Sequence, residues 1–248
     1  MVWELVRSWF DSLWFKISSV FLFQKELSIA IIGLQNSGKT TLIRLLGGKP
    51  FETDTVPTLG IQVSHFSLEN NLIKVYDLAG QTRFQPLWER CFDKVDLIIY
   101  MIDLSDTMTL NESLQKLVKV IQMANGDRIP LLIVGNKTDL VADPKDPLPL
   151  GPLQAYNPDN WEKLKLDSTN AHLLKNPDIL SRQIGVDLAA RTLHVPLQSS
   201  EPPANESNAQ GPANDTKQLP LHGDIAVLTV SCKDGSHIAD VIDWIVQL

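Results

Sequence analysis

Cysteine is scarce in this chain. Cys91 and Cys232 are the only two cysteines among 248 residues, and neither lies in a zinc-binding or redox pattern. Structural disulfides belong to oxidising compartments, so a reducing cytosol is the expected location. Basic residues are outnumbered by acidic ones, and the formal net charge is −7. Because a nucleic-acid-binding surface is usually basic, we expect no nucleic-acid partner.

The N-terminal arm, residues 1 to about 24, lacks an apolar run long enough to span a membrane. Its longest uncharged stretch is Ile17–Gln24, whereas a spanning helix needs about 20 apolar residues. The arm instead predicts an amphipathic helix, whose apolar face contains Trp3, Val6, Phe10, Leu13, Ile17 and Val20. Two interpretations remain: this face packs on its own domain, or it lies in a membrane interface. The crowding of tryptophans in the arm favours the membrane.

Signals for covalent lipid anchors are missing as well. Position 2 is Val2, not the glycine that N-myristoylation requires, and Val246–Leu248 includes no cysteine for prenylation. Acidic residues interrupt the apolar part of the arm, which is not typical of a signal peptide. We therefore expect any membrane attachment to depend on the amphipathic helix.

What the sequence does contain is a phosphate-binding pattern. Residues Gly33–Thr40 fit G-x-x-x-x-G-K-[ST], between a predicted strand, Leu27–Ile32, and a predicted helix, Thr41–Leu46. The backbone N–H groups of such a loop direct positive charge at an anion, although an isolated match can also be a glycine turn that binds nothing. Lys39 would reach the β- and γ-phosphates, and the Thr40 hydroxyl would bind Mg²⁺. The predicted contacts are Gln35, Asn36, Ser37, Gly38, Lys39, Thr40 and Thr41.

Two later segments add metal-binding and catalytic candidates. Thr58, in a Pro-Thr pair, is a candidate second Mg²⁺ ligand that also contacts the γ-phosphate. Asp77, at the end of a predicted strand, can hold Mg²⁺ through a water molecule. Gly80 allows its N–H to approach a γ-phosphate closely, and Gln81 can orient an attacking water. A D-x-x-G pattern alone is common, but its distance from the phosphate loop and the glutamine that follows it strongly support these roles.

A guanine-reading pattern, N-K-x-D, occupies residues 136–139. The Asp139 carboxylate would accept two hydrogen bonds from guanine, one from N1–H and one from the exocyclic amine, which adenine does not offer together. Such an acceptor discriminates strongly because the wrong base leaves it buried and unpaired. Asn136 and Lys137 belong to the same site, with the lysine stem lying along the base. A loop that closes over the guanine is predicted at Ser231, Cys232 and Lys233.

The remaining pattern predicts strands alternating with helices. The other predicted strands are Ile61–Leu68, Leu72–Leu78, Val95–Asp103, Ile129–Gly135 and Ile225–Val230, and the other helices are Thr82–Lys94, Leu110–Met123 and His237–Gln247. Residues 141–223 interrupt this pattern and hold eleven of the fifteen prolines. Within them we expect helices at Trp161–Leu166 and Pro177–Leu193, and disorder over Leu197–Pro220.

Together the motifs resemble those of a Ras-superfamily small GTPase, specifically the Arf family. The resemblance covers residues 1–140 and 224–248, and its motifs are at 33–41, 57–60, 77–81 and 136–140. Arg83-Phe84, Trp88-Glu89-Arg90 and Ser231-Cys232-Lys233 are similar to the lysosome-associated Arf-like branch. The coat-assembly Arf-like GTPases of the endoplasmic reticulum are the alternative branch, but they have histidine where this chain has Gln81.

The resemblance implies an α/β fold of the P-loop NTPase (small GTPase) type. Residues 25–248 would form a mostly parallel six-stranded sheet flanked by helices, with nucleotide at the carboxyl ends of the strands. Residues 1–24 would form the N-terminal amphipathic helix, which in Arf relatives leaves its groove for the membrane in the GTP state. The long Pro-rich insertion at about 141–223 need not disrupt the domain, because the entropic cost of loop closure grows only logarithmically with length.

The resemblance also implies a function: a GTP-binding molecular switch. It would bind GTP or GDP with Mg²⁺, hydrolyse GTP slowly, and depend on an exchange factor and a GTPase-activating protein. In the GTP state it would recruit effectors for membrane, vesicle or lysosome trafficking. We expect a monomer in the cytosol and on the cytosolic face of intracellular membranes, with lysosome, late endosome or vacuole as candidate organelles. The alternative from another class is a non-hydrolysing scaffold with a GTPase fold.

Two features of the sequence depart from the family pattern: one motif residue and the surface expected to bind effectors. Ala79 replaces the first glycine of the family's D-x-G-G-Q motif and removes that residue's backbone freedom. The positions that match the family's aromatic effector surface are Ile61, Tyr76 and Cys91. These remain apolar but offer less aromatic area, so the family pattern does not identify the effectors.

Overall fold

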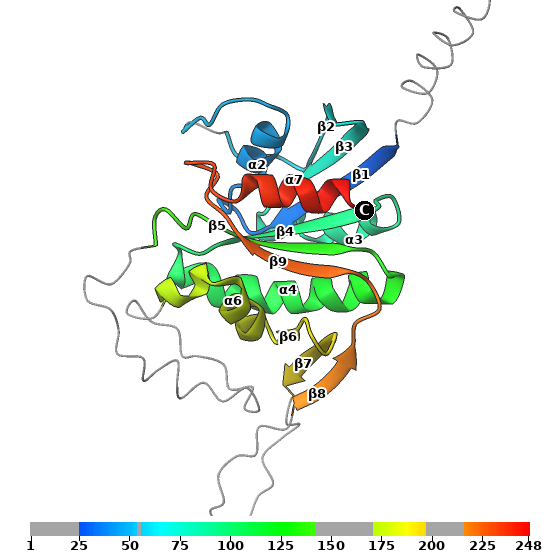
Figure 1. Cartoon of the computed structure of the whole chain (residues 1–248), viewed down its shortest axis with the longest axis vertical. Coiled ribbons are helices and arrows are strands. Elements are labelled where there is room, and N and C mark those ends of the chain that lie inside the picture. The colour runs from blue at the N-terminus through cyan, green and yellow to red at the C-terminus, as the bar shows by residue number, and fades with distance from the viewer. Residues whose placement is uncertain (1–24, 54–55, 142–170, 197–215) are drawn as a thin grey trace, which may run out of the picture.

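The computed structural model describes residues 25–53, 56–141, 171–196 and 216–248 (Figure 1). The predicted membrane-helix residues Trp3, Val6, Phe10, Leu13 and Ile17 lie outside the described residues, as does the predicted helix Trp161–Leu166. Most of the predicted disordered segment, residues 197–215, is also outside them.

A six-stranded sheet forms the centre of the domain. Its strands are β1 (Glu26–Gly33), β2 (Ile61–Leu68), β3 (Asn71–Leu78), β4 (Leu97–Asp103), β5 (Leu131–Asn136) and β9 (Ile225–Thr229). Their order is β2-β3-β1-β4-β5-β9, and only the β2–β3 pair is antiparallel. The predicted mostly parallel sheet with one antiparallel edge strand is confirmed. Every residue of β4 and β5 is buried, as expected for central parallel strands covered on both faces.

Helices cover both faces of this sheet (Figure 1). On one face lie α2 (Lys39–Leu46) and α7 (Ile238–Val246), which contribute Leu42 and Val241 to one buried cluster. On the other lie the short 3₁₀ turn η1 (Thr82–Phe84), α3 (Pro86–Phe92), α4 (Thr107–Asp127), a second turn η2 (Ala171–Lys175) and α6 (Pro177–Ile184). Leu114 and Leu180 belong to the cluster on that face. The layers confirm the predicted fold class.

A second, three-stranded sheet was not predicted. It consists of β6 (Val186–Asp187), β7 (Thr192–Pro196) and β8 (Thr216–Pro220), paired antiparallel in that order. The predicted helix Pro177–Leu193 is therefore wrong beyond Ile184, and the predicted disorder is wrong for the last five residues of 197–220. Gly185 ends α6 in the left-handed conformation, with φ 98°, which favours glycine.

Contacts with the main domain stabilise this second sheet. Leu193 and Leu219 pair across β7 and β8, and both pack against the buried cluster of α4 and α6. The Asn125 side chain on α4 donates to the carbonyl of Pro220 at 2.9 Å and accepts from the backbone N–H of His222 at 2.6 Å. The hairpin therefore belongs to the same packed unit as the six-stranded sheet.

Candidate functional site

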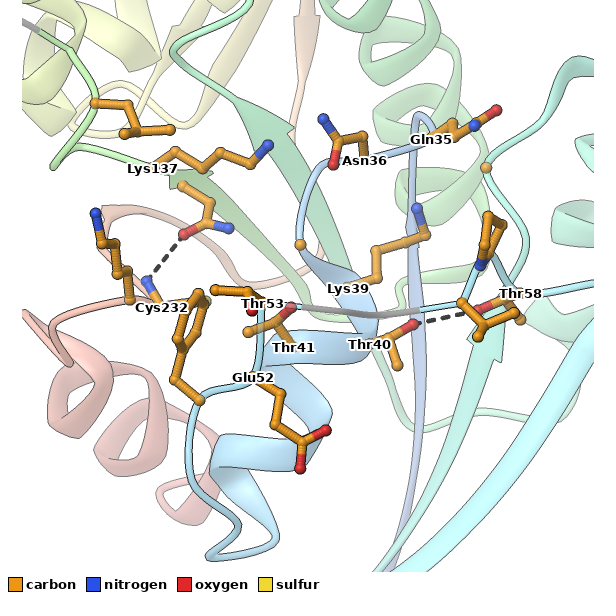
Figure 2. A pocket seen from close by; sticks show the side chains of 18 of the residues that line it. Gln35, Asn36, Lys39, Thr40, Thr41, Glu52, Thr53, Thr58, Lys137 and Cys232 are labelled. Atoms are coloured by element: carbon orange, nitrogen blue, oxygen red, sulfur yellow. Dashed lines mark hydrogen bonds between the residues drawn. The ribbon is translucent and has the colours of Figure 1, made fainter.

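A cavity of about 540 Å³ lies where the loops after β1, β3, β5 and β9 meet (Figure 2). The predicted residues that line it are Gln35, Asn36, Gly38, Lys39, Thr40, Thr41, Thr58, Gly80, Gln81, Asn136, Lys137, Asp139, Cys232 and Lys233. Ser37 and Ser231 are buried and do not line the cavity. The fold thus brings together the predicted phosphate, catalytic and base-reading residues at the carboxyl ends of the parallel strands.

Close backbone packing shapes the phosphate loop. Gly38, directly before α2, has φ 96°, and a Cβ there would overlap the Asn136 side chain. The Ser37 hydroxyl donates to the Leu34 carbonyl at 2.9 Å and closes the loop on itself. Asn136 Nδ2 donates to the Ser37 carbonyl at 2.9 Å, and its Oδ1 accepts from the Cys232 N–H at 3.1 Å (Figure 2). Asn136 therefore links the phosphate loop to the loop predicted to close over guanine.

The Lys39 ammonium group is buried, and no anionic group among the described residues forms an ion pair with it. The residue is 6% exposed, and Nζ donates to the Leu34 carbonyl at 2.7 Å, toward the loop that carries Gln35 and Asn36 (Figure 2). Burial lowers the pKa of Lys39 to about 8, although the nearby Asp77 charge acts in the opposite direction. A phosphate group beside Nζ would compensate this desolvation, so the site fits an anion.

Three oxygen-bearing side chains converge next to Lys39. Thr40 Oγ1 donates to Asp77 Oδ2 at 2.6 Å, and Thr58 Oγ1 donates to the same oxygen at 3.3 Å. The two hydroxyls are 3.2 Å apart (Figure 2). Asp77 is 2% exposed, its Oδ1 is buried with no hydrogen-bond partner in the described part of the chain, and burial raises its pKa. Hydroxyl and carboxylate oxygens suit Mg²⁺, which is usually held by few protein groups and several waters. The predicted metal residues therefore fit that ion.

Ion pairs and hydrogen bonds order the end of the cavity that is predicted to read the base. Ser231 Oγ donates to Asp139 Oδ1 at 2.7 Å, and Lys233 Nζ lies 3.7 Å from Asp139 Oδ2. Lys137 has φ 65°, and its Nζ lies 2.7 Å from Asp103 Oδ2 at the end of β4. Sequence reasoning missed Asp103, because one aspartate at the end of a strand belongs to no motif.

Cys232 contributes its backbone rather than its thiol. The side chain is buried, and burial raises the pKa of the thiol to about 12, so the thiol is neutral near pH 7. This agrees with the absence of a redox pattern in the sequence. The backbone N–H, held by Asn136, is the group that orders the loop.

The lining of the cavity includes one aromatic residue that was not predicted. Phe51 lines the cavity and is 37% exposed. Its segment is attached to α2, because Arg44 pairs with Glu52 and the Lys49 N–H donates to the Arg44 carbonyl at 2.8 Å. The aromatic ring therefore supplies apolar surface to the wall of the cavity, a property that no pattern in the sequence indicated.

The Ala79–Gln81 segment packs directly on the phosphate loop. A Cβ on Gly80 would overlap the backbone of Leu34 and Gln35 and lie 2.6 Å from the Gly33 carbonyl oxygen. Ala79 is buried, has no positive φ, and its carbonyl accepts from the Trp88 indole at 3.2 Å. The first glycine of the family motif is therefore not required for this conformation, whereas the second one is.

The predicted effector surface needs one correction. Ile61 is 41% exposed and Tyr76 is half-buried, but Cys91 is only 5% exposed. Cys91 lies on the inner side of α3 and packs with the core beneath it. Two exposed apolar residues near β2, Leu59 and Val63, extend the surface instead.

Because Lys39 is buried, we predict that the protein takes up protons when it binds GTP. Its pKa of about 8 in the free protein should rise when phosphates bind, so affinity should fall as the pH rises above 8. Calorimetry in buffers of different ionisation enthalpy should then show uptake of roughly three quarters of a proton per GTP near pH 8.5, and roughly 0.1 near pH 7. The Lys39→Arg variant, which stays charged, should show no such uptake. Buffer-independent heats near pH 8.5 would contradict the assignment.

Comparison with known proteins adds independent information. The family model described as ADP-ribosylation factor family matches residues 14–147. ADP-ribosylation factor-like protein 8d from Arabidopsis thaliana is 39% identical over 116 residues, which cover 47% of this chain and 66% of that protein. ADP-ribosylation factor-like protein 8b from the same organism is 34% identical over 138 residues, covering 56% of this chain and 71% of that protein. The chain thus spans about two thirds of the first of these relatives.

A solved structure is similar in fold. It is described as the Arl6 BBS3 small GTPase from Trypanosoma brucei with bound nucleotide analogue GppNp. The TM-score is 0.52 with 19% sequence identity, and the match covers 90% of this chain and 96% of that chain. At this identity the likeness concerns the fold alone.

Proposed function

This chain belongs to the ADP-ribosylation factor (Arf) family of small GTPases, and we propose that it is a GTP/GDP switch that hydrolyses GTP slowly with Mg²⁺. The observation that carries the proposal is the convergence of Thr40, Thr58 and Asp77 beside the buried Lys39. Thr58 lies in the segment that precedes β2, outside the rigid sheet. Ligand contacts through Thr58 would therefore order that segment in one nucleotide state and release it in the other.

Each residue of the site has a part in the proposed reaction. Lys39 and the backbone N–H groups of the loop bind the phosphates, and Asp139 reads the guanine. Thr40 and Thr58 would hold Mg²⁺ directly and Asp77 through water. When bound, Mg²⁺ would neutralise charge that develops on the phosphate oxygens. The Gly80 N–H binds the γ-phosphate, and Gln81 orients the attacking water.

Intrinsic hydrolysis is expected to be slow. No arginine is found among the described residues that line the cavity. An arginine supplied by a GTPase-activating protein accelerates GTP hydrolysis by roughly 10³–10⁵ in other GTPases. We therefore propose that this protein depends on such an activator, as well as on an exchange factor.

The partners of the GTP state are proposed to bind beside β2. Ile61 and Tyr76 lie on neighbouring antiparallel strands, and the exposed Leu59 and Val63 extend the same apolar surface. This surface borders the Thr58 segment, so ordering by nucleotide would change its shape. Effector recruitment on membranes, in vesicle or lysosome trafficking, is the biological role that we propose.

The proposed membrane contact is the N-terminal arm. No helix in the described ranges is long and apolar enough to cross a bilayer. Lys25, directly before β1, lies beside Leu248, because Lys25 Nζ donates to the Leu248 carbonyl at 2.7 Å. Lys25 therefore lies near α7, at the edge of the sheet opposite the carboxyl ends of the parallel strands.

Sedimentation with anionic liposomes tests this part of the proposal. The full chain loaded with a non-hydrolysable GTP analogue should bind more tightly than the GDP-loaded chain, because only the GTP state frees the apolar face for the membrane. The Phe10→Asp variant should lose binding in both states, since burying a charge in the interface is costly. An Asp11→Asn variant on the polar face serves as control. Equal binding in both nucleotide states would contradict the coupling.

A further inference from the structure

The side-chain oxygen of Gln81 already has a hydrogen-bond partner. Arg83 Nε donates to Gln81 Oε1 at 3.0 Å. Gln81 lines the nucleotide cavity, whereas Arg83 and its neighbour Phe84 do not. A hydrogen bond is directional, so Oε1 points toward Arg83, which does not line the cavity.

The Arg83 side chain is itself held in place. Its guanidinium carbon lies 4.6 Å from the centre of the Phe84 ring, a cation–π contact. Both residues belong to η1, for which Gln81 is the N-terminal cap residue with an extended backbone, φ −65° and ψ 142°. One turn of chain therefore carries both the proposed catalytic amide and the group that holds it.

The arrangement matters because of what the amide oxygen must do. In the proposed mechanism, Oε1 accepts a hydrogen bond from the attacking water and so orients it. The charged Arg83 donor makes this oxygen a weaker acceptor for water. It also favours the orientation in which the Gln81 side chain points at Arg83. Every hydrolysis event must then begin with the exchange of this hydrogen bond for one to water.

We propose that Arg83 is a positioning residue that restrains Gln81 and thereby slows intrinsic GTP hydrolysis. The inference rests on the proposed function. Arg83 is exposed to solvent, so the restraint is weak. Exposed charged contacts change equilibria by factors of about two to five, and we expect an effect of that size on the rate.

Single-turnover hydrolysis of preloaded GTP by the full chain tests the inference. The Arg83→Met variant keeps an apolar stem over Phe84 but has no donor, and Arg83→Ala removes both. Both variants should hydrolyse GTP about two- to fivefold faster than the wild type, with unchanged GDP dissociation. The matched control is Arg90→Ala, which removes an exposed arginine from α3 and should leave the rate unchanged.

The Arg83→Met substitution is also made in the Gln81→Leu variant. This double variant shows whether Arg83 acts through Gln81 or through the local structure. Gln81→Leu alone should lower the rate while GTP stays bound. Adding Arg83→Met to Gln81→Leu should then change nothing, because the two residues act through one hydrogen bond. Arg83 variants that are slower than or equal to the wild type, or an acceleration that persists with Gln81→Leu, would overturn the inference. A wild type that binds GTP but never converts it would overturn the proposed function itself, and the inference with it.

Discussion

The Asp139→Asn variant is expected to prefer xanthine nucleotides over guanine nucleotides. The native carboxylate can accept two hydrogen bonds, which matches the N1–H and exocyclic amine of guanine. Asparagine has the same shape but replaces one acceptor with a donor. Xanthine carries a carbonyl in place of the amine, so its edge is complementary to the amide.

The hydrogen bond from Ser231 to Asp139 fixes how the amide of the Asp139→Asn variant is oriented. Ser231 Oγ donates to Asp139 Oδ1 at 2.7 Å, so the amide oxygen of the variant can take the same position. Its NH₂ group then occupies the other position, where guanine presents a donor. Loss of one charged hydrogen bond and creation of a donor–donor clash should weaken GTP binding by at least about 100-fold, since each 1.4 kcal/mol is a factor of ten.

Displacement of a fluorescent GDP analogue by GTP, XTP and ATP measures this change. We expect XTP to bind the variant at least about tenfold more tightly than GTP, with ATP weak against both proteins. Asp93→Asn, an exposed aspartate at the end of α3, is the control and should keep the wild-type order. Retention of the GTP preference by Asp139→Asn would show that another group reads the base.

The Gly80→Ala variant is expected to bind GDP normally but to lose GTP hydrolysis. The three atoms nearest to a Cβ at this position would be backbone atoms of Gly33, Leu34 and Gln35, which form the phosphate loop itself. Because the loop cannot move without losing its phosphate contacts, the Ala79–Gln81 segment must withdraw. The Gly80 N–H and the Gln81 side chain would then no longer reach the γ-phosphate.

The size of the effect follows from the loss of preorganised donors. Removing one such donor lowers catalytic rates by about 10²–10³ in other enzymes, and we expect a loss of at least about 100-fold here. GDP lacks the γ-phosphate, so its affinity should change little. Gly126→Ala is the matched control, because a Cβ in that part of α4 meets nothing within 4 Å. Wild-type hydrolysis by Gly80→Ala would contradict the packing of this segment on the phosphate loop.

Much of the domain could be predicted because its signals are local. Buried parallel strands appear as apolar runs, such as Leu97–Asp103, and the phosphate and base motifs follow directly after strands. Strand order then places these loops at one edge of the sheet. Most of the predicted nucleotide-site residues line one cavity for this reason.

The second sheet was missed because its pairing is not local. Leu193 and Leu219 pair across a long intervening segment, and neither strand has a pattern that is strong by itself. Leu193 also fits the apolar face of a helix, so the periodicity of the sequence favoured extending α6. Only Gly185, in the left-handed conformation, ends that helix where the structure does.

Side-chain geometry explains the remaining differences. Cys91 was assigned to the surface from its motif position, but the packing of the short helix α3 turns it inward. Asp103 and Arg83 act on Lys137 and Gln81 through single contacts that depend on side-chain orientation. Neither contact leaves a repeat or a spacing in the sequence, so no pattern could have revealed it.

The most direct test of the central claim is single-turnover GTP hydrolysis by the purified full chain with Mg²⁺, with bound nucleotide counted and ATP present as competitor. We predict one tightly bound guanine nucleotide per chain, no effect of excess ATP, and slow conversion of GTP to GDP that becomes much faster with an activating protein. Binding with no conversion under any condition would contradict the switch and favour a scaffold with a GTPase fold. Absence of nucleotide binding would contradict the assigned site as a whole.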